Sequence, residues 1–282
     1  MTSTASGPAH TRAARVPCAA YLEAADAAGA VHRLDGHLVV AGEHGDPLTG
    51  ELQCLVEYAA PALLGPPHHA GRLPGLSDAM VPGAASVLLR HPGQGALPAP
   101  WTRSLTYLRL HAAAAVPASG LVLREATAAD VRSVRSWLAE AIGNGLRARR
   151  TSAAASEVAA AADAVWNRAD RVTLVVVADG EPVGHGTLLM DEYDDLTGEP
   201  FVDLWDTLVA RPELRGPATD LLIAAAAERA ARASRPLVGN VVHSAPGSDG
   251  EGHGERIVAS LTAKGWRVTH EYWHHPLDRG DM

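Results

Sequence analysis

The sequence has little of several residue types on which common protein classes depend. It contains only two cysteines, Cys18 and Cys54, in 282 residues. Two isolated cysteines give neither the paired spacing of a zinc site nor the even set of a disulfide framework. We therefore expect two reduced thiols in a cytosolic protein and no structural metal.

Lysine is almost absent as well, since Lys264 is the single example, and the formal net charge is -8. Nucleic acid is normally bound by a basic surface. The composition therefore argues against a nucleic-acid partner.

Long apolar runs are also missing. The longest ones, such as AAAAVPASGLVL, are short and broken by proline and glycine, well below the ~20 residues of a membrane span. The first seventeen residues are polar and lack the apolar segment of a signal peptide. The sequence thus predicts no membrane contact and a cytoplasmic location.

What is present divides the chain into parts. Residues 1–15 are expected to form a flexible N-terminus, and HAAAAVPASG (111–120) is typical of a linker. A first domain is expected over residues 16–115 and a second over residues 120–282. The hydrophobic fraction of 47% is enough to give both a buried core.

The second domain has the clearer pattern. A short strand, LVLREAT, precedes a segment with apolar residues at helical spacing from Val131 to Ile142. A second helix follows, then two strands joined at Asp179-Gly180, which is a strong hairpin signal. A strand, FVDLWDTLVA, an alanine-rich helix over 218–233, a strand, a helix and a last strand complete the order β-α-α-β-β-β-α-β-α-β.

This order, over residues 120–277, resembles the GNAT (Gcn5-related N-acetyltransferase) superfamily. The stretch LVARPELRG (208–216) is similar to the run that leads into the acyl-CoA pyrophosphate loop of that family, and VADGEPVGHGTL is typical of its second and third strands. The resemblance implies a mixed α/β fold with a central, mostly antiparallel sheet flanked by helices.

The first domain has the pattern of a degenerate copy of the second. HLVVAGEHGDPLTGELQCLVE (37–57) parallels TLVVVADGEPVGHGTLLMDE (173–192), and WTRSLTYLRL parallels the terminal WRVTHEYW. Tandem chains with one degenerate half occur in the family. The alternative is an unrelated accessory domain that contains an ordinary hairpin.

The resemblance implies an acetyl-CoA site at the turn into the alanine-rich helix. Unpaired N–H groups and the helix dipole at such a turn favour a phosphate. The implied contacts are Leu208, Val209, Ala210, Arg215, Gly216, Pro217, Ala218, Thr219 and Asp220. The N–H of Val209 or Ala210 corresponds to the one that bonds the thioester carbonyl. Asp220 departs from the family pattern, because its carboxylate would repel the pyrophosphate.

Transfer of an acetyl group to an amine requires a base. In GNAT enzymes it is often a carboxylate on the strand that carries Asp203 and Asp206 here. Three positions apart, they face opposite sides of a regular strand, and a bulge near Trp205, common in this fold, would bring both toward the cleft. The alternative is a solvent-exposed pair, in which case Glu192 and His243 are the next candidates.

The sequence leaves the general acid open, because Leu261 stands where the family usually has a tyrosine. Leu261 cannot donate a proton. Tyr272 and His243 are the substitutes, and departure of the thiolate without help is the other route, since a thiol has a pKa of about 8.5.

Neither the histidines nor the acidic run indicates a metal. His270 and His274 on the last strand are about 13 Å apart, too far to share an ion with bonds near ~2 Å. We expect the histidines to be solvated at the surface. The run DEYDDLTGE (191–199) is expected to be a loop, either simply solvated or placed over the acceptor side, where it would attract a cationic amine.

These patterns predict an acyl-CoA-dependent N-acyltransferase. We expect it to acetylate a primary amine of a small molecule or peptide, of the natural-product tailoring or self-resistance type, by direct transfer in a ternary complex. A monomer or homodimer is expected. The alternatives are a non-catalytic GNAT-like ligand-binding or scaffold module, which Asp220 and Leu261 favour, and an enzyme with a longer or protein-borne acyl donor.

Overall fold

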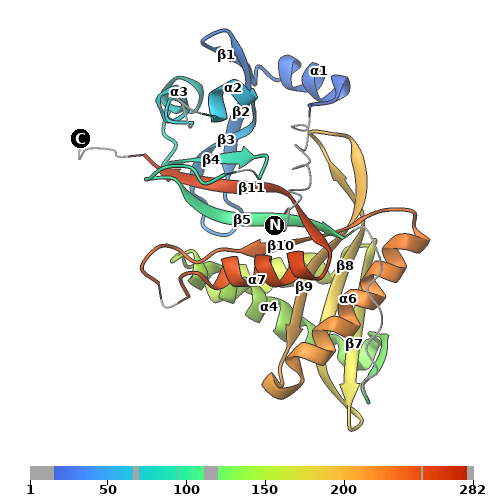
Figure 1. The fold of residues 1–282 in the computed structure, drawn as a ribbon. Helices are drawn as coiled ribbons and strands as arrows, with labels where there is room; N and C mark the ends of the chain where they lie inside the picture. The colour runs from blue at the N-terminus through green and yellow to red at the C-terminus, as the bar shows by residue number, and fades with distance from the viewer. Residues whose placement is uncertain (1–15, 66–69, 94, 111–119, 249, 278–282) are drawn as a thin grey trace, which may run out of the picture.

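The computed structural model describes residues 16–65, 70–93, 95–110, 120–248 and 250–277. Within them a single sheet of eleven strands runs through both halves of the chain in the order β1-β2-β3-β4-β11-β5-β10-β9-β8-β7-β6. Figure 1 shows the first half at one end of this sheet and the second half at the other. The expected flexible N-terminus and most of the expected linker lie outside the described residues.

The first half is built on a hairpin and a parallel strand pair. Its elements are α1 (Ala19–Ala27), β1 (Val31–Leu34), β2 (His37–Gly45), β3 (Leu52–Ala59), α2 (Pro61–Leu64), α3 (Pro74–Met80), β4 (Ser86–His91) and β5 (Thr102–Leu110). β2 and β3 are antiparallel, whereas β3 and β4 are parallel. Leu63 and Leu73 cover the strand residues Val56 and Leu89 in one apolar cluster.

The second half has the predicted element order. It comprises β6 (Val122–Glu125), the 3₁₀ turn η1 (Ala128–Asp130), α4 (Val131–Ala148), α5 (Ala155–Trp166), β7 (Arg171–Ala178), β8 (Glu181–Asp194), β9 (Glu199–Val209), the 3₁₀ turn η2 (Pro212–Leu214), α6 (Arg215–Arg232), β10 (Leu237–Val242), α7 (His253–Ala263) and β11 (Trp266–Pro276). Asp179 and Gly180 form the predicted turn between β7 and β8, and both have the positive φ that a tight hairpin turn needs.

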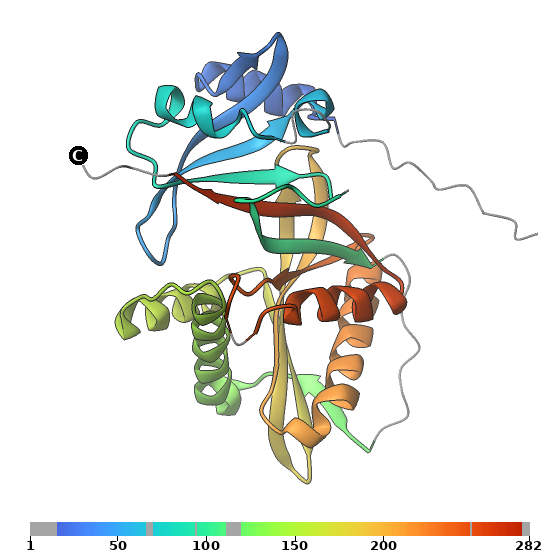
Figure 2. The same cartoon turned by 60° about the vertical axis from the view of Figure 1, so that its left-hand side comes forward.

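Helices cover both faces of the second-half strands. α6 buries Ala218, Leu222 and Ala226, four residues apart, in a cluster that also contains Trp266 of β11. α4 and α5 pack on Val175 of β7, which faces the other way. Figure 2 shows α4 and α5 on one side of β7, β8 and β9, with α6 on the opposite side.

The last strands of the two halves are exchanged. β5 pairs with β10, β11 pairs with β4, and β5 and β11 pair with each other at the centre, all antiparallel. The parallel pair β3–β4 of the first half corresponds to the parallel pair β9–β10 of the second, each separated in sequence by helix. The tandem arrangement predicted from the sequence is therefore confirmed.

One detail of the sequence repeat differs. Because the parallel neighbour of β3 is β4, the hairpin β2–β3 takes the place of β8–β9 rather than that of β7–β8. The predicted match of 37–57 with 173–192 was thus displaced by one strand. The match of β5 with β11 agrees with their equivalent places in the sheet.

The described residues add two further facts. None of their helices combines the length and the apolar character that a membrane crossing requires. Cys18 and Cys54 are free thiols, and no cluster of three or more histidine, cysteine, aspartate or glutamate side chains in this part of the chain is placed to hold a metal ion.

Candidate functional site

Strands β9 and β10 touch only briefly and then diverge. Their paired positions run from Val202↔Leu237 to Leu204↔Gly239, three positions in all. Both strands continue, β9 to Val209 and β10 to Val242. The edge of β9 that faces β10 therefore carries backbone groups without a strand partner, and α6 begins just past its end.

Trp205 is the point at which β9 changes course. The pairing of β9 with β8 passes from Leu204↔Leu188 to Asp206↔Thr187, so Trp205 is an extra residue. Such an insertion is a β-bulge, and the predicted bulge is therefore present. Asp203 lies opposite Leu189, two positions from Thr187, so the carboxylates of Asp203 and Asp206 share one face of the sheet. This is the face that α4 and α5 cover.

Asp203 has the surroundings of a titrating group. Its Oδ1 is buried and has no hydrogen-bond partner among the described residues. Burial, helped by the nearby carboxylate of Glu192 and opposed by Arg168, raises the pKa of Asp203 to about 7. Arg168 is itself bonded to Glu192, with 2.5 Å between Nη2 and Oε1. A carboxyl group that ionises near neutral pH is suited to act as a general base.

Asp206 lies against a histidine that sequence reasoning missed. Its Oδ2 is 3.2 Å from Nε2 of His185, whose side chain is fully buried. The ring of His185 stacks on Trp137 of α4, with 5.6 Å between centroids and 9° between planes. Its Nδ1 is 3.2 Å from Oγ1 of Thr187. The signal in the sequence was a histidine between two glycines in the middle of an apolar strand.

A pocket lies on the same face of the sheet, toward the first half. Its volume is about 170 Å³. Its lining includes Val238, the parallel strand neighbour of Asp203, so Asp203 is one strand away from it. Arg109 is opposite Val238 on the other side and belongs to the lining as well. The acidic run expected as a loop forms the end of the β8–β9 hairpin, and residues 193–195 and 199–201 line the pocket too.

The two predicted acids lie on different faces. Tyr272 lines the pocket, and burial raises its pKa to about 12. His243 lies on the opposite face, where Nε2 is 2.8 Å from Oγ1 of Thr106 and Nδ1 is 3.0 Å from Oε1 of Glu255 in α7. Burial lowers the pKa of His243. Of the two, only Tyr272 shares a face with Asp203.

Several histidines differ from the expected solvated state. His185 and His243 are buried, and His270 stacks on Tyr107 with 4.6 Å between ring centroids. His274 is partly buried, and burial lowers its pKa. The expectation of surface histidines was wrong for these positions because composition alone does not show which strand face is covered.

The start of α6 also differs from the expectation. The helix begins at Arg215, three residues before Ala218, because η2 precedes it directly. The N–H of Arg215 donates to the carbonyl of Pro212 within this turn. Arg215, Gly216 and Pro217 are exposed, whereas Ala218 is fully buried.

Two neighbouring groups bear on the acyl-CoA contacts. Oδ1 of Asp220 is 2.5 Å from Nζ of Lys264, so a cation balances the unexpected carboxylate. The N–H of Ala210 donates to the carbonyl of Val183 in β8 at 2.9 Å. Because successive N–H groups of a strand point to opposite edges, the N–H of Val209 is directed toward β10.

No family model and no curated protein sequence matches this chain. Among solved structures, it is similar to a GNAT-family acetyltransferase from Colwellia psychrerythraea, with a TM-score of 0.50 and 9% identity over 88% of this chain and 84% of that one. A functionally unknown conserved protein from Staphylococcus epidermidis gives a TM-score of 0.49 and 10% identity over 86% and 91%. A tandem GNAT protein from the clavulanic acid biosynthesis pathway gives 0.40 and 17% over 88% and 82%. The chain therefore has the GNAT fold that its sequence predicted.

Proposed function

We propose that this protein is an acyl-CoA-dependent N-acyltransferase that acetylates a primary amine. The observation that carries the proposal is the bulge at Trp205. It places Asp203 and Asp206 on one face of the sheet, at the point where β9 and β10 separate. The GNAT fold and its similarity to a GNAT-family acetyltransferase support this class of reaction.

The residues present fit an acyl-CoA at the end of β9. Gly216, in the first turn of α6, has no atom within 4 Å of the place where a Cβ would stand, so the backbone there is open to a phosphate. Arg215 is exposed beside it. Lys264 compensates the charge of Asp220. Val209, with its N–H directed toward β10, would hold the thioester carbonyl.

The chemistry assigns a separate task to each carboxylate. An amine enters as an ammonium ion and must lose a proton before its nitrogen attacks the thioester carbon. Asp203, with a pKa of about 7, would take that proton. Asp206, 3.2 Å from the ring of His185 on the same face, would support the amine from the other side of the bulge. The tetrahedral adduct then collapses to the amide and releases the thiolate.

The structure favours departure of the thiolate without a proton from Tyr272. The phenol has a pKa of about 12, and a thiol has one of about 8.5, so this transfer would be uphill by roughly three to four pKa units. Leu261, packed on the apolar core, offers no alternative donor. Protonation by solvent after release fits these values better.

We also assign the two halves different tasks. Residues 120–282 would supply the acyl-CoA contacts and the base, and residues 16–115 would act as a structural partner that completes the pocket. The expected stoichiometry is one CoA per chain. In the first half the helices between β3 and β4 are the short α2 and α3, and each begins with a proline, Pro61 or Pro74, which lacks an N–H donor.

Two measurements test the proposal. Titration calorimetry with CoA should give one site per chain, and a thiol-release assay with acetyl-CoA and a panel of primary amines should show turnover. CoA binding without turnover on any amine would favour a GNAT-like binding module, the interpretation that Leu261 supports. Absence of CoA binding would overturn the proposal.

A further inference from the structure

The pocket below the β8–β9 hairpin crosses the sheet from one half to the other. It takes one or more lining residues from each of six adjacent strands: Glu57 of β3, Arg90 of β4, Tyr272 of β11, Tyr107 of β5, Val238 of β10 and Phe201 of β9. The site is therefore complete only when the two halves are joined. The hairpin of the second half forms its cover.

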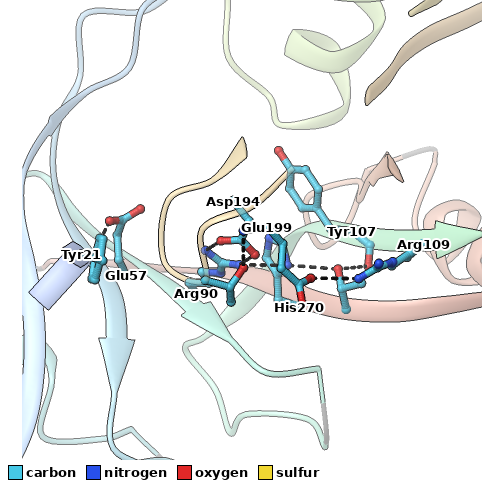
Figure 3. A network of polar contacts seen from close by, with 10 residues as sticks. Tyr21, Glu57, Arg90, Tyr107, Arg109, Asp194, Glu199 and His270 are labelled. Carbon is cyan, nitrogen blue, oxygen red and sulfur yellow. Dashed lines mark hydrogen bonds and ion pairs between the residues drawn. The ribbon is translucent and has the colours of Figure 1, made fainter. Parts of the chain in front are cut away.

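Both guanidinium groups of the lining are already matched by carboxylates of the hairpin. Arg90 donates from Nη1 to Oδ1 of Asp194 at 2.9 Å and from Nη2 to Oδ2 at 2.7 Å. Arg109 donates from Nη1 to Oε2 of Glu199 at 2.9 Å. Figure 3 shows Arg90 and Arg109 with these two carboxylates. Neither arginine therefore adds a net positive charge.

Two further carboxylates belong to the lining, Glu57 and Asp195. Oε2 of Glu57 accepts a hydrogen bond of 2.6 Å from the hydroxyl of Tyr21, which fixes its position without cancelling its charge. Asp195 lies at the exposed end of the hairpin. Both contribute to the raised pKa of Tyr272, so both lie within electrostatic range of that phenol. Among the described lining residues, four carboxylates stand against two guanidinium groups, so this part of the lining is negative.

Aromatic rings supply the walls between these charges. Tyr107 stacks on His270 and meets Tyr272 edge-on at 5.8 Å between centroids. Ring faces of this kind attract organic cations and bury carbon chains. The pocket volume is about 170 Å³, and one water molecule occupies about 10–15 Å³ of a cavity measured in this way. The pocket therefore has room for a ligand of about a dozen non-hydrogen atoms.

We propose that this pocket binds a small organic cation, with its charge balanced by the lining carboxylates Glu57 and Asp195 and its carbon chain against Tyr107 and Tyr272. Val238, which lines the pocket, is paired with Asp203 on the neighbouring strand. The assignment of the cation as the amine acceptor rests on the proposed function. The binding itself does not.

The test uses three probes of one chain length and no acyl donor. Hexamethylenediamine, the neutral hexamethylene glycol and the dianion adipate are titrated into the full-length protein by calorimetry. We expect the diamine to bind at least about tenfold more tightly than the glycol, because a charge-assisted contact replaces a neutral one. Equal binding of diamine and glycol, or tighter binding of adipate, would overturn the inference.

Variants locate the charged end. Glu57→Gln keeps an oxygen that can accept the hydrogen bond of Tyr21 but removes the charge. The variant should bind the diamine about tenfold more weakly and the glycol with unchanged affinity. Asp195→Asn, at an exposed position, makes the same test if Glu57→Gln does not fold. Glu181→Gln, exposed at the start of β8, is the matched control. Diamine binding that is insensitive to both pocket variants would place the cation elsewhere and contradict the proposal.

A parallel CoA titration separates the two proposals. Diamine binding without CoA binding would leave the cation pocket intact and remove the acyltransferase function. CoA binding without diamine binding would contradict the cation pocket and leave the acyltransferase proposal standing.

Discussion

Arg90 and Asp194, 104 residues apart in the sequence, form a bidentate ion pair between the two halves of the chain. Their side chains are 8% and 10% exposed. Arg90 directly follows Leu89, the last residue of β4 paired with β3. The β8–β9 hairpin is thus fixed to the first half at the position where β3 and β4 stop pairing.

Removal of Arg90 alone should destabilise the protein strongly. Arg90→Met removes the two hydrogen bonds and the balancing charge that Arg90 gives to the enclosed carboxylate of Asp194. Loss of one partner of a buried ion pair typically costs about 3–5 kcal/mol of unfolding free energy. The double variant R90M/D194L should recover most of the loss. Urea denaturation measures both. Arg232→Met, which breaks the exposed pair with Glu228, is the control and should change little; a similar small loss for Arg90→Met would contradict the buried-pair account.

Asp203→Asn should lower turnover by about 10²–10⁴-fold, the usual contribution of a general base. CoA affinity should stay nearly constant, because the carboxylate acts on the amine. In the wild-type protein, kcat/KM should rise through pH about 7, where Asp203 ionises. Asp179→Asn, exposed in the β7–β8 turn, serves as the control. Full activity of the Asp203→Asn variant across pH 6 to 9 would show that the base lies elsewhere, with Glu192 as the next group to test.

The same carboxyl group should give the stability a distinct pH dependence. Its folded pKa of about 7 lies above the ordinary value of about 3.9, so the folded state favours the protonated form. This contribution is fully present below pH 4 and is lost as the pH rises from 4 through 7. Asp203→Asn removes the buried charge, so the variant should gain stability over the wild type at pH 8 and much less at pH 5. Urea denaturation at pH 5 and pH 8 measures the difference in unfolding free energy between the variant and the wild type. An equal difference at both pH values would show that Asp203 is not enclosed in solution.

Asp206 and His185 should act as one unit. Oδ2 of Asp206 is 3.2 Å from Nε2 of His185, and neither buried atom has a hydrogen-bond partner among the described residues. We therefore expect loss of either group to change the electrostatic surroundings of the other. Asp206→Asn and His185→Gln should each lower kcat by about tenfold or more. The kcat of the double variant should be no lower than that of the less active single variant. Multiplying effects would show that the two side chains act independently. CoA affinity provides the check that the fold is retained.

Lys264 and Asp220 should affect CoA binding in opposite directions. Lys264→Gln leaves the Asp220 carboxylate uncompensated near the phosphate contacts, so it should weaken binding. Asp220→Asn frees the ammonium group of Lys264 and should tighten binding, and the double variant should bind nearly as the wild type does. Both single effects should shrink at high salt because the groups are about half exposed. Calorimetry with CoA measures them, and two silent single variants would place the phosphates away from the first turn of α6.

The sequence by itself determined the elements of the second half of this protein and their order. Alternating apolar residues, the Asp179-Gly180 turn and the alanine-rich segment depend on contacts between near neighbours. In the second half, most strands and helices therefore formed where these patterns predicted them, although residues 191–194 of the expected loop belong to β8. The bulge at Trp205 was expected from the resemblance to the family, because two carboxylates three positions apart share a face only if one residue is extra. The sequence analysis placed the start of α6 at Ala218, whereas the helix begins at Arg215, directly after the 3₁₀ turn at Pro212. The local sequence did not show that this turn leads into the helix without a break.

Only the tertiary structure decided which of these side chains meet. The exchange of β5 and β11 brings Tyr107 beside His270 and Glu57 into a pocket with Val238. The packing of α6 and α7 against one apolar cluster brings Lys264 to Asp220 across 44 residues. Strand order is set by burial of apolar faces over the whole chain, and no local pattern records it. A histidine such as His185 therefore becomes a partner of Asp206 only after β8 has paired with β9 and α4 has covered that face.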